Sequence, residues 1–262
     1  MFDHSSKAAT AFYQVVLTIF GLIFAFPAYV MIKVSLGGEG FGNYLAVLKL
    51  EQFPRYFLNS AIVSAGTIVV VFVCVLLGAY AFSKLQFRFK NGWFNLILIG
   101  LMIPSVSLVV PLFITVKNLQ LFDTYLAVIG PIAALAIPFN LLLMKNFFDE
   151  VPNGLLEAAR IDGCNSFSAL TRIMLPMSKP IAIVVVIWTF LNSWNEYFLG
   201  LVFMRSDKMQ LVTQAPKFFV DTYSSDIHKV FAALVLISLP VLISYILLQK
   251  YFEDGMTSGS IK

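Results

Sequence analysis

Charged residues are scarce in this 262-residue sequence, where Asp, Glu, Lys and Arg together make up only 12% of the chain. Hydrophobic residues make up 59%, and the mean hydropathy is +0.86. Soluble domains carry about 25% charged residues. The composition therefore excludes a typical soluble globular protein and indicates that most of the apolar surface meets lipid or other membrane helices. A net charge of +4 suits loops that face anionic headgroups and calls for no nucleic-acid partner.

Side chains that usually carry catalysis or hold metals are also rare. The two histidines, His4 and His228, lie far apart in the chain, and no His/Cys cluster has metal-ligand spacing. The two cysteines are not expected to pair, because Cys74 lies in an apolar run and Cys164 in a polar segment. The dipeptide Gly-Lys and the motif H-E-x-x-H do not occur, which excludes a nucleotide-binding P-loop and a metalloprotease site of that type. We therefore expect no enzyme, no catalytic or metal site, and no cofactor in this chain.

Long apolar runs occupy most of the sequence, and about 20 apolar residues suffice to cross a bilayer as a helix. They predict an all-α, polytopic membrane helix bundle, with residues 1–262 forming one transmembrane domain. Six spans, an even number, place both termini on one side of the membrane. The short loop 83–92 has three basic residues and no acidic one, which favours the cytoplasm for this loop and for both termini. The predicted spans are 12–32, 61–82, 94–114, 125–144, 181–204 and 230–248.

The most polar long segment between two apolar runs comprises residues 151–180. Its first half predicts a short helix, with Pro152 in the first turn and Gly163 closing the helix in a left-handed conformation. The expected apolar side of this helix consists of Leu155, Leu156, Ala159 and Ile161.

A second short helix is predicted over residues 167–174, with Ser166 as its cap and Leu175-Pro176 as its end. Unstructured connections as long as the 151–180 segment are uncommon unless they are functional. Its small side chains beside a carboxylate suit close docking into the cleft of a partner. The residues alone leave two interpretations open, an ordinary surface connection or a docking segment.

The spacing of Glu157-Ala158-Ala159, Gly163 and Ile173-Met174-Leu175-Pro176 resembles the EAA loop of ATP-binding-cassette (ABC) importer permeases. The sequence Ile161-Asp162-Gly163 is similar to the carbohydrate branch, specifically the second permease of maltose-type transporters. The resemblance covers nearly the full chain. Its other parts are Asn59-Ser60, residues 79–82, residues 123–125, Trp194-Asn195-Glu196 and the tail 255–262.

In that family the EAA loop forms a coupling helix that docks in a groove of the cytoplasmic ATPase. The resemblance implies a transmembrane permease subunit of an ABC importer for sugars or oligosaccharides, located in a prokaryotic cytoplasmic membrane. The implied partners are a second permease, two copies of an ATPase subunit that hold ATP and Mg, and an extracytoplasmic solute-binding protein. The implied ATPase-coupling residues are Glu157, Ala158, Ala159, Asp162, Gly163, Leu175 and Pro176.

Glu196 is the one ionisable residue inside a predicted span. A charge at that depth costs at least ~2.5 kcal/mol, so its carboxylate should face the bundle or a watery cavity. With Trp194 and Asn195 it offers an aromatic face, an amide and a carboxylate, which suit sugar hydroxyls and make these three residues candidates for the translocation path. A helix-packing hydrogen bond is the alternative role for Glu196. The rival function for the chain is a self-sufficient secondary carrier that uses Glu196 as its coupling site.

Overall fold

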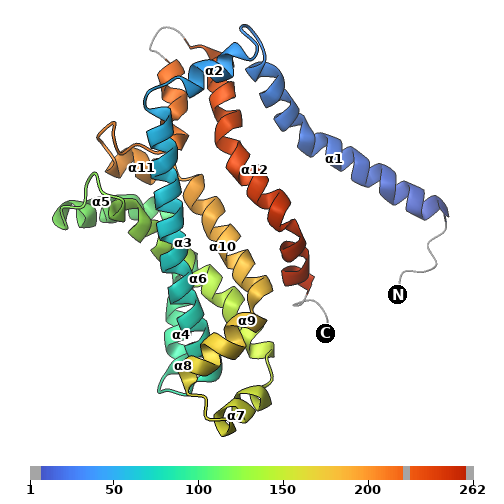
Figure 1. Cartoon of the computed structure of the whole chain (residues 1–262), viewed down its shortest axis with the longest axis vertical. Coiled ribbons are helices and arrows are strands. Elements are labelled where there is room, and N and C mark those ends of the chain that lie inside the picture. Colours follow the sequence, from blue (N-terminus) through green and yellow to red (C-terminus); the bar gives the residue numbers. More distant parts are fainter. Residues whose placement is uncertain (1–6, 221–224, 258–262) are drawn as a thin grey trace. The chain divides into compact units, whose positions relative to one another are not determined.

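The computed structural model describes residues 7–220 and 225–257, which form helices and loops (Figure 1). Apart from one isolated β-bridge between Val220 and Ser225, these residues contain no β-structure, so the predicted all-α fold is confirmed. The chain divides into two compact units, Met1–Phe53 with Ala215–Leu239 and Pro54–Gln214 with Pro240–Lys262. The predicted cytoplasmic termini and the end of the 255–262 tail lie outside the described residues.

Among the described residues, four helices are long and apolar enough to cross a membrane. These helices correspond to four of the predicted spans, and each helix is longer than the span predicted for it. Two bent helix pairs raise the number of candidate spans to as many as six. The four continuous helices are α1 (Lys7–Ser35), α3 (Phe53–Lys84), α6 (Leu126–Glu150) and α12 (Ile227–Thr257).

The predicted span 94–114 is a broken helix. Its two halves, α4 (Lys90–Ile99) and α5 (Val109–Asn118), belong to a pair that is bent by 95°. The bend lies at Pro104, which has no backbone N–H to donate and forces the residue before it out of the helical conformation. Pro111 lies in the first turn of α5, where a missing N–H is tolerated. Two short 3₁₀ turns connect the halves, η1 (Gly100–Met102) and η2 (Ser105–Leu108).

The predicted span 181–204 is also interrupted, so the prediction of one continuous helix there is wrong. Helix α10 (Lys179–Trp194) ends ten residues before the predicted boundary, and α11 (Phe198–Phe203) follows after a three-residue break. The chain then passes through a loop to the 3₁₀ helix η4 (Val212–Phe219).

The first unit joins α1, the short helix α2 (Gly42–Leu48) and the beginning of α12. The amide of Asn43 donates to the carbonyls of Ser35 (2.9 Å) and Gly37 (2.7 Å), which fixes the turn after α1. His228 Nδ1 lies 2.8 Å from the Val34 carbonyl oxygen and anchors the same turn to α12.

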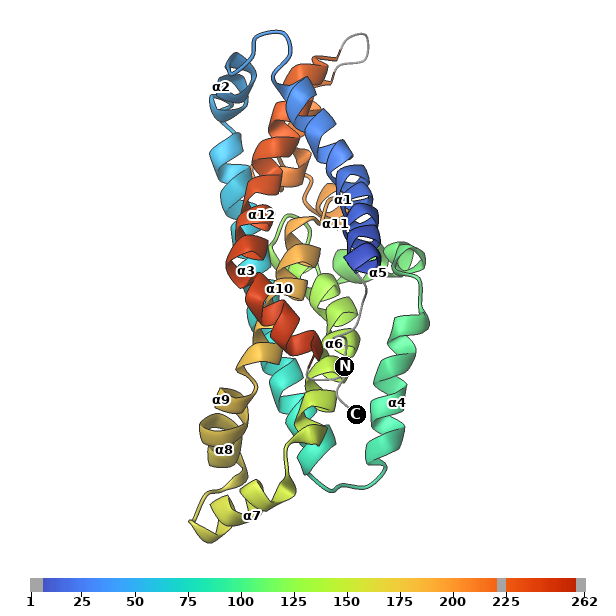
Figure 2. The same cartoon turned by 90° about the vertical axis from the view of Figure 1, so that its right-hand side faces the viewer.

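The second unit packs α3, α6 and α10 against one another (Figures 1 and 2). Gly66 on α3 faces Ile129 on α6 so closely that a Cβ there would lie 2.6 Å from Ile129 Cδ1. Two clusters of buried apolar residues form its core. One contains Leu141 and Leu156 and includes the 151–180 segment, and the other contains Ile132 and Leu199 and includes α5 and α11.

The loop between α11 and η4 is held by Asn59, a buried residue of α3. Its Nδ2 donates to the carbonyls of Lys208 (3.0 Å) and Gln210 (2.9 Å), and its Oδ1 accepts from the hydroxyl of Tyr125 (2.9 Å). This single amide therefore ties α3 to the loop and to the start of α6.

Two further polar side chains complete this attachment. Ser60 Oγ accepts from the Val212 N–H (2.9 Å), and Asp123 Oδ1 accepts from the Ser206 N–H (2.8 Å). The Asn59-Ser60 and 123–125 parts of the resemblance thus converge on one loop.

The 151–180 segment is tethered to the end of α3 by Lys84. Its Nζ donates to the Val151 carbonyl (2.6 Å) and to Asn153 Oδ1 (3.1 Å), at the beginning of the segment. Ser83 Oγ donates to Asp149 Oδ1 (2.7 Å) at the end of α6. The ends of α3 and α6 and the start of the 151–180 segment are therefore joined by side-chain hydrogen bonds.

We predict that Asn59→Leu lowers the thermal unfolding midpoint of the detergent-solubilised protein more than Tyr125→Phe does. The first change leaves the Gln210 carbonyl and the Tyr125 hydroxyl without these partners, at about 1–3 kcal/mol each, while the Lys208 carbonyl still accepts from Arg55 Nε (2.8 Å). The second change removes one hydrogen bond only. Equal midpoints for the two variants would show that Asn59 does not hold the loop.

We predict that Lys84→Met accelerates backbone hydrogen exchange in residues 153–161 by about tenfold. The variant keeps the apolar stem but loses two hydrogen bonds of roughly 1 kcal/mol each. The control is Lys117→Met, in the last turn of α5. Unchanged protection of residues 153–161 in Lys84→Met would contradict a tethering role.

Candidate functional site

The 151–180 segment begins with the predicted helix, α7 (Asn153–Ile161), preceded by Pro152 as its N-cap residue. Figure 2 shows α7 and the helices that follow it at the lower end of the second unit. The helix ends at Gly163 with φ +86°, as predicted. The N–H groups of Gly163 and Cys164 bond to the carbonyls of Arg160 (3.1 Å) and Ala159 (2.8 Å), the two bonds of a Schellman motif.

The two sides of α7 have different environments. Leu156 and Ala159 are buried, at 4% and 5% exposure, and Leu156 belongs to the same core cluster as Leu141. Leu155 and Ile161, expected on the same apolar side, are instead exposed, and Ile161 reaches 87%.

The expected ATPase-coupling residues divide between these sides. Glu157, Ala158, Asp162, Gly163 and Pro176 are exposed, Leu175 is half-buried, and Ala159 lies inside. Glu157 also lines a small polar cavity of about 150 Å³ between α7 and the end of α3. The exposed residues are thus free to meet a partner, whereas Ala159 joins the helix to its own chain.

The second predicted helix of the segment begins one residue earlier than expected. Its cap is Asn165, whose Oδ1 accepts from the Ser168 N–H (2.8 Å), so Ser166 is the first residue of α8 (Ser166–Ala169). The motif Asn-x-x-Ser offers this bond as readily as Ser166 would, because asparagine is a strong N-cap.

The expected stop at Leu175-Pro176 is wrong. The chain continues through the π-helical turn η3 (Leu170–Met174) and α9 (Leu175–Met177), and bends by 82° at Ser178 into α10. A π turn is wider than an α turn, and here it directly precedes Pro176, whose ring would clash with the carbonyl four residues before it in a regular helix. The 151–180 segment is therefore linked to α10 by helix rather than by loop.

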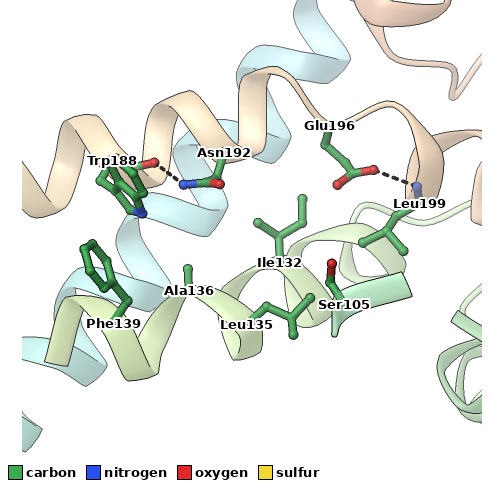
Figure 3. A pocket seen from close by; sticks show the side chains of 9 residues that line it. All are labelled: Ser105, Ile132, Leu135, Ala136, Phe139, Trp188, Asn192, Glu196 and Leu199. Carbon is green, nitrogen blue, oxygen red and sulfur yellow. Dashed lines mark hydrogen bonds between the residues drawn. The ribbon is translucent and has the colours of Figure 1, made fainter. Parts of the chain in front are cut away.

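A cavity of about 220 Å³ lies between α10 and α6, with Ser105 at its side (Figure 3). Three of its residues, Trp188, Asn192 and Glu196, are four positions apart on one face of α10 and the turn that follows it. The α6 wall is apolar. It consists of Ile132, Leu135, Ala136 and Phe139, with Leu199 of α11 beside it.

Glu196 lies in the break after α10 and not inside a continuous helix. Its Oε1 accepts from the Leu199 N–H (2.7 Å) in the first turn of α11, as Figure 3 shows. Carboxylates stabilise helix N-termini, because the first N–H groups have no partner within the helix. Among the described residues, no hydrogen bond is made to Oε2. Glu196 therefore caps α11 with one oxygen and retains a free acceptor beside the cavity.

The break itself is held by η4. Thr213 Oγ1 donates to the Glu196 carbonyl (2.8 Å), and Gln214 Nε2 donates to the Tyr197 carbonyl (3.3 Å). Thr213 replaces the backbone donor that a continuing helix would supply to the Glu196 carbonyl, whereas the Tyr197 carbonyl also accepts from the Leu201 N–H (2.9 Å). The bond from Thr213 is the physical reason why α10 can end inside an apolar run.

The residues proposed for the translocation path do not all face this cavity. Glu196 lines it, but Trp194 is 3% exposed and packs against the rings of Phe57 (5.1 Å) and Phe190 (5.6 Å). Asn195 is exposed and is the C-cap residue of α10. Sequence reasoning missed Trp188 and Asn192, although their four-residue spacing before Glu196 was a visible signal.

Residues 7–220 and 225–257 contain no group of three or more His, Cys, Asp or Glu side chains placed to hold a metal ion. Cys74 and Cys164 are both free, as the sequence predicts.

Relatives of this chain are transport proteins. It is 34% identical to the arabinooligosaccharides transport system permease protein AraQ of Halalkalibacterium halodurans, over 79% of this chain and 74% of that protein. It is 30% identical to the diacetylchitobiose uptake system permease protein NgcG of Streptomyces coelicolor, over 85% of this chain and 74% of that protein.

The fold matches a crystal structure of a bacterial ABC transporter involved in the import of the acidic polysaccharide alginate. The TM-score is 0.81 at 24% sequence identity, and the match covers 95% of this chain and 99% of the other. The family model described as "Binding-protein-dependent transport system inner membrane component" matches residues 74–258. The chain therefore belongs to this family of inner-membrane components of binding-protein-dependent transport systems, and it is a multi-pass permease subunit of an ABC importer.

Proposed function

We propose that this permease serves an importer for sugars or oligosaccharides and is driven by an ATPase that docks on the exposed side of α7. The observation that carries the docking role is the two-sided environment of that helix. Leu156 and Ala159 fix it to its own chain, while Glu157 and Ile161 remain open to a partner. Helix α7 is thus packed against its own chain on one side and accessible to a partner on the other.

The proposed assembly contains this chain, a second permease, two ATPase subunits and an extracytoplasmic binding protein. ATP and Mg belong to the ATPase subunits. This agrees with the absence of a Gly-Lys pair from the chain. The membrane is the cytoplasmic membrane of a prokaryote.

Saccharides are the proposed substrate class for two reasons. The related permeases AraQ and NgcG carry saccharides in their names. The cavity between α10 and α6 also pairs aromatic rings with polar acceptors, a combination that suits a ring bearing hydroxyl groups.

The end of the second unit that carries α7 is proposed to face the cytoplasm. Lys84, Arg88 and Lys90 cluster in the loop at that end, and Lys84 bonds directly to the 151–180 segment. Basic residues in short loops favour the cytoplasmic side. With six spans, both termini then lie in the cytoplasm as well.

In the proposed mechanism, closure of the ATPase dimer displaces α7, and the displacement passes along α8, η3 and α9 into α10. The helical path through the bend at Ser178 supports this transmission, because packed helices move as rigid bodies. Since α10 carries Trp188, Asn192 and Glu196, the motion changes the walls of the cavity.

We predict that Gly163→Ala lowers recovery of the ATPase in a pull-down of the detergent-solubilised assembly by about 5–20-fold. A Cβ at this position meets no atom within 4 Å, so the only penalty is the left-handed backbone, about 1–2 kcal/mol. The matched control is Gly154→Ala in α7, where a Cβ likewise meets nothing but φ is not positive. Equal recovery with both variants would contradict the proposed docking surface.

We predict that Glu157→Lys reduces ATP-driven uptake in proteoliposomes at least tenfold, because it reverses the exposed charge on the docking side of α7. The control is Glu51→Lys, at an exposed glutamate outside the 151–180 segment, which should keep uptake near the wild-type rate. Uptake that continues without any ATPase subunit would instead favour a secondary carrier.

A further inference from the structure

We infer that the cavity between α10 and α6 is a binding subsite for one uncharged sugar ring of the transported saccharide, with Trp188, Asn192 and Glu196 as its contact residues. This inference rests on the proposed function and adds to it a direct role for this subunit in substrate recognition. The permease would then bind part of its substrate instead of only enclosing a path.

The volume of the cavity limits the ligand. Its 220 Å³ is below the ~300–1,000 Å³ of pockets that enclose drug-sized molecules. One ring of a saccharide fits this size, while the remaining rings of an oligosaccharide would extend outside it.

The aromatic side of the cavity offers a surface for the C–H face of a sugar. The rings of Trp188 and Phe139 lie 5.2 Å apart at an angle of 42°, and Trp188 is 41% exposed. Figure 3 shows both rings at one end of the cavity, Asn192 beside Trp188, and Glu196 and Ser105 toward the other end. Aromatic side chains provide a large, rigid contact area, and the polar edge of a sugar stays free for hydrogen bonds.

The polar side of the cavity offers two hydrogen-bond acceptors, one from Asn192 and one from Glu196. One Nδ2 hydrogen of Asn192 is engaged by the Trp188 carbonyl (2.7 Å), which leaves its Oδ1 to accept and its second N–H to donate. Glu196 Oε1 is engaged by the Leu199 N–H (2.7 Å), which leaves Oε2. Sugar hydroxyls donate to such acceptors, and bonds to a charged acceptor are the stronger ones. The two side chains lie one helical turn apart, so neighbouring hydroxyls on one ring could reach both.

The charge of the cavity selects among sugars. None of the nine described lining residues is basic, and one, Glu196, is acidic. A carboxylate on the ligand would meet a like charge with no cation to compensate it. A neutral sugar is therefore accepted and a uronate is disfavoured, although the similar fold described above belongs to an importer of an acidic polysaccharide.

The test uses the complete assembly with its binding protein in proteoliposomes loaded with ATP, and it measures both saccharide uptake and ATP hydrolysis. The probes are an arabino-oligosaccharide and diacetylchitobiose as neutral saccharides, and an alginate oligosaccharide as an acidic one. The variants are Asn192→Ala and Trp188→Leu. Their matched controls are Asn95→Ala and Trp93→Leu, the same changes at exposed positions of α4 outside the cavity.

We expect both cavity variants to take up about tenfold less neutral saccharide per ATP hydrolysed, while both controls stay within about twofold of the wild type. Hydrolysis stimulated by the binding protein should persist in all four, which shows that they fold and couple. Should a cavity variant lose this stimulation, Glu196→Gln replaces it. That variant keeps an oxygen to cap α11, removes the charge, and should narrow the discrimination against the alginate probe.

Uptake per ATP that is equal in cavity and control variants would overturn the subsite and leave the proposed importer intact. If the wild-type assembly takes up neither neutral saccharide, the proposed substrate class fails, and the subsite fails with it.

Discussion

Backbone groups in an apolar environment must find partners, and this constraint shapes the break after α10 and the loop after α11. At both places side chains supply hydrogen bonds to backbone carbonyls. Asn59 satisfies two carbonyls of the loop after α11, and Thr213 satisfies the carbonyl of Glu196 at the break after α10. Because these bonds hold the break open, a carboxylate can sit beside the cavity without interrupting a packed helix. The proposed sugar subsite thus depends on polar groups that also satisfy backbone carbonyls and N–H groups.

The 151–180 segment is held in a different way. Much of it is exposed, and the buried side of α7 fixes its position. Leu156 enters the same core cluster as Leu141 of α6, and Lys84 holds the start of the segment from α3. In the proposed mechanism a helix fixed in this way transmits a push instead of absorbing it. After the turn 162–165 that joins α7 to α8, the route toward the cavity is helical, through η3 and α9 into α10.

The sequence predicted the helical class, the apolar runs and the limits of α7 correctly, because these follow from hydropathy and from single residues with fixed conformational effects. Gly163 is the clearest case, since its left-handed backbone is observed as expected. The incorrect predictions concern helix ends that are determined by contacts with other parts of the structure. Pro176 does not end its helix because a π turn makes room for it, and the end of α10 is set by Thr213 and Gln214, which are distant in sequence. Ala159 is buried as its place on the expected apolar side predicts, but Leu155 and Ile161, expected on the same side, are exposed, because packing that no local pattern reveals decides which of these residues are covered.

The two core clusters of the second unit have a consequence for how such proteins diversify. Leu156, behind the surface proposed to face the ATPase, belongs to one cluster, whereas Ile132 and Leu199, in the walls of the cavity, belong to the other. Substitutions of Ile132 or Leu199 therefore repack a different set of neighbours from those that support α7, whereas Ala136 of the same wall packs against the first cluster. Gene duplication followed by change in the second cluster alone can yield permeases with new cargo that still accept the same energy-supplying subunit.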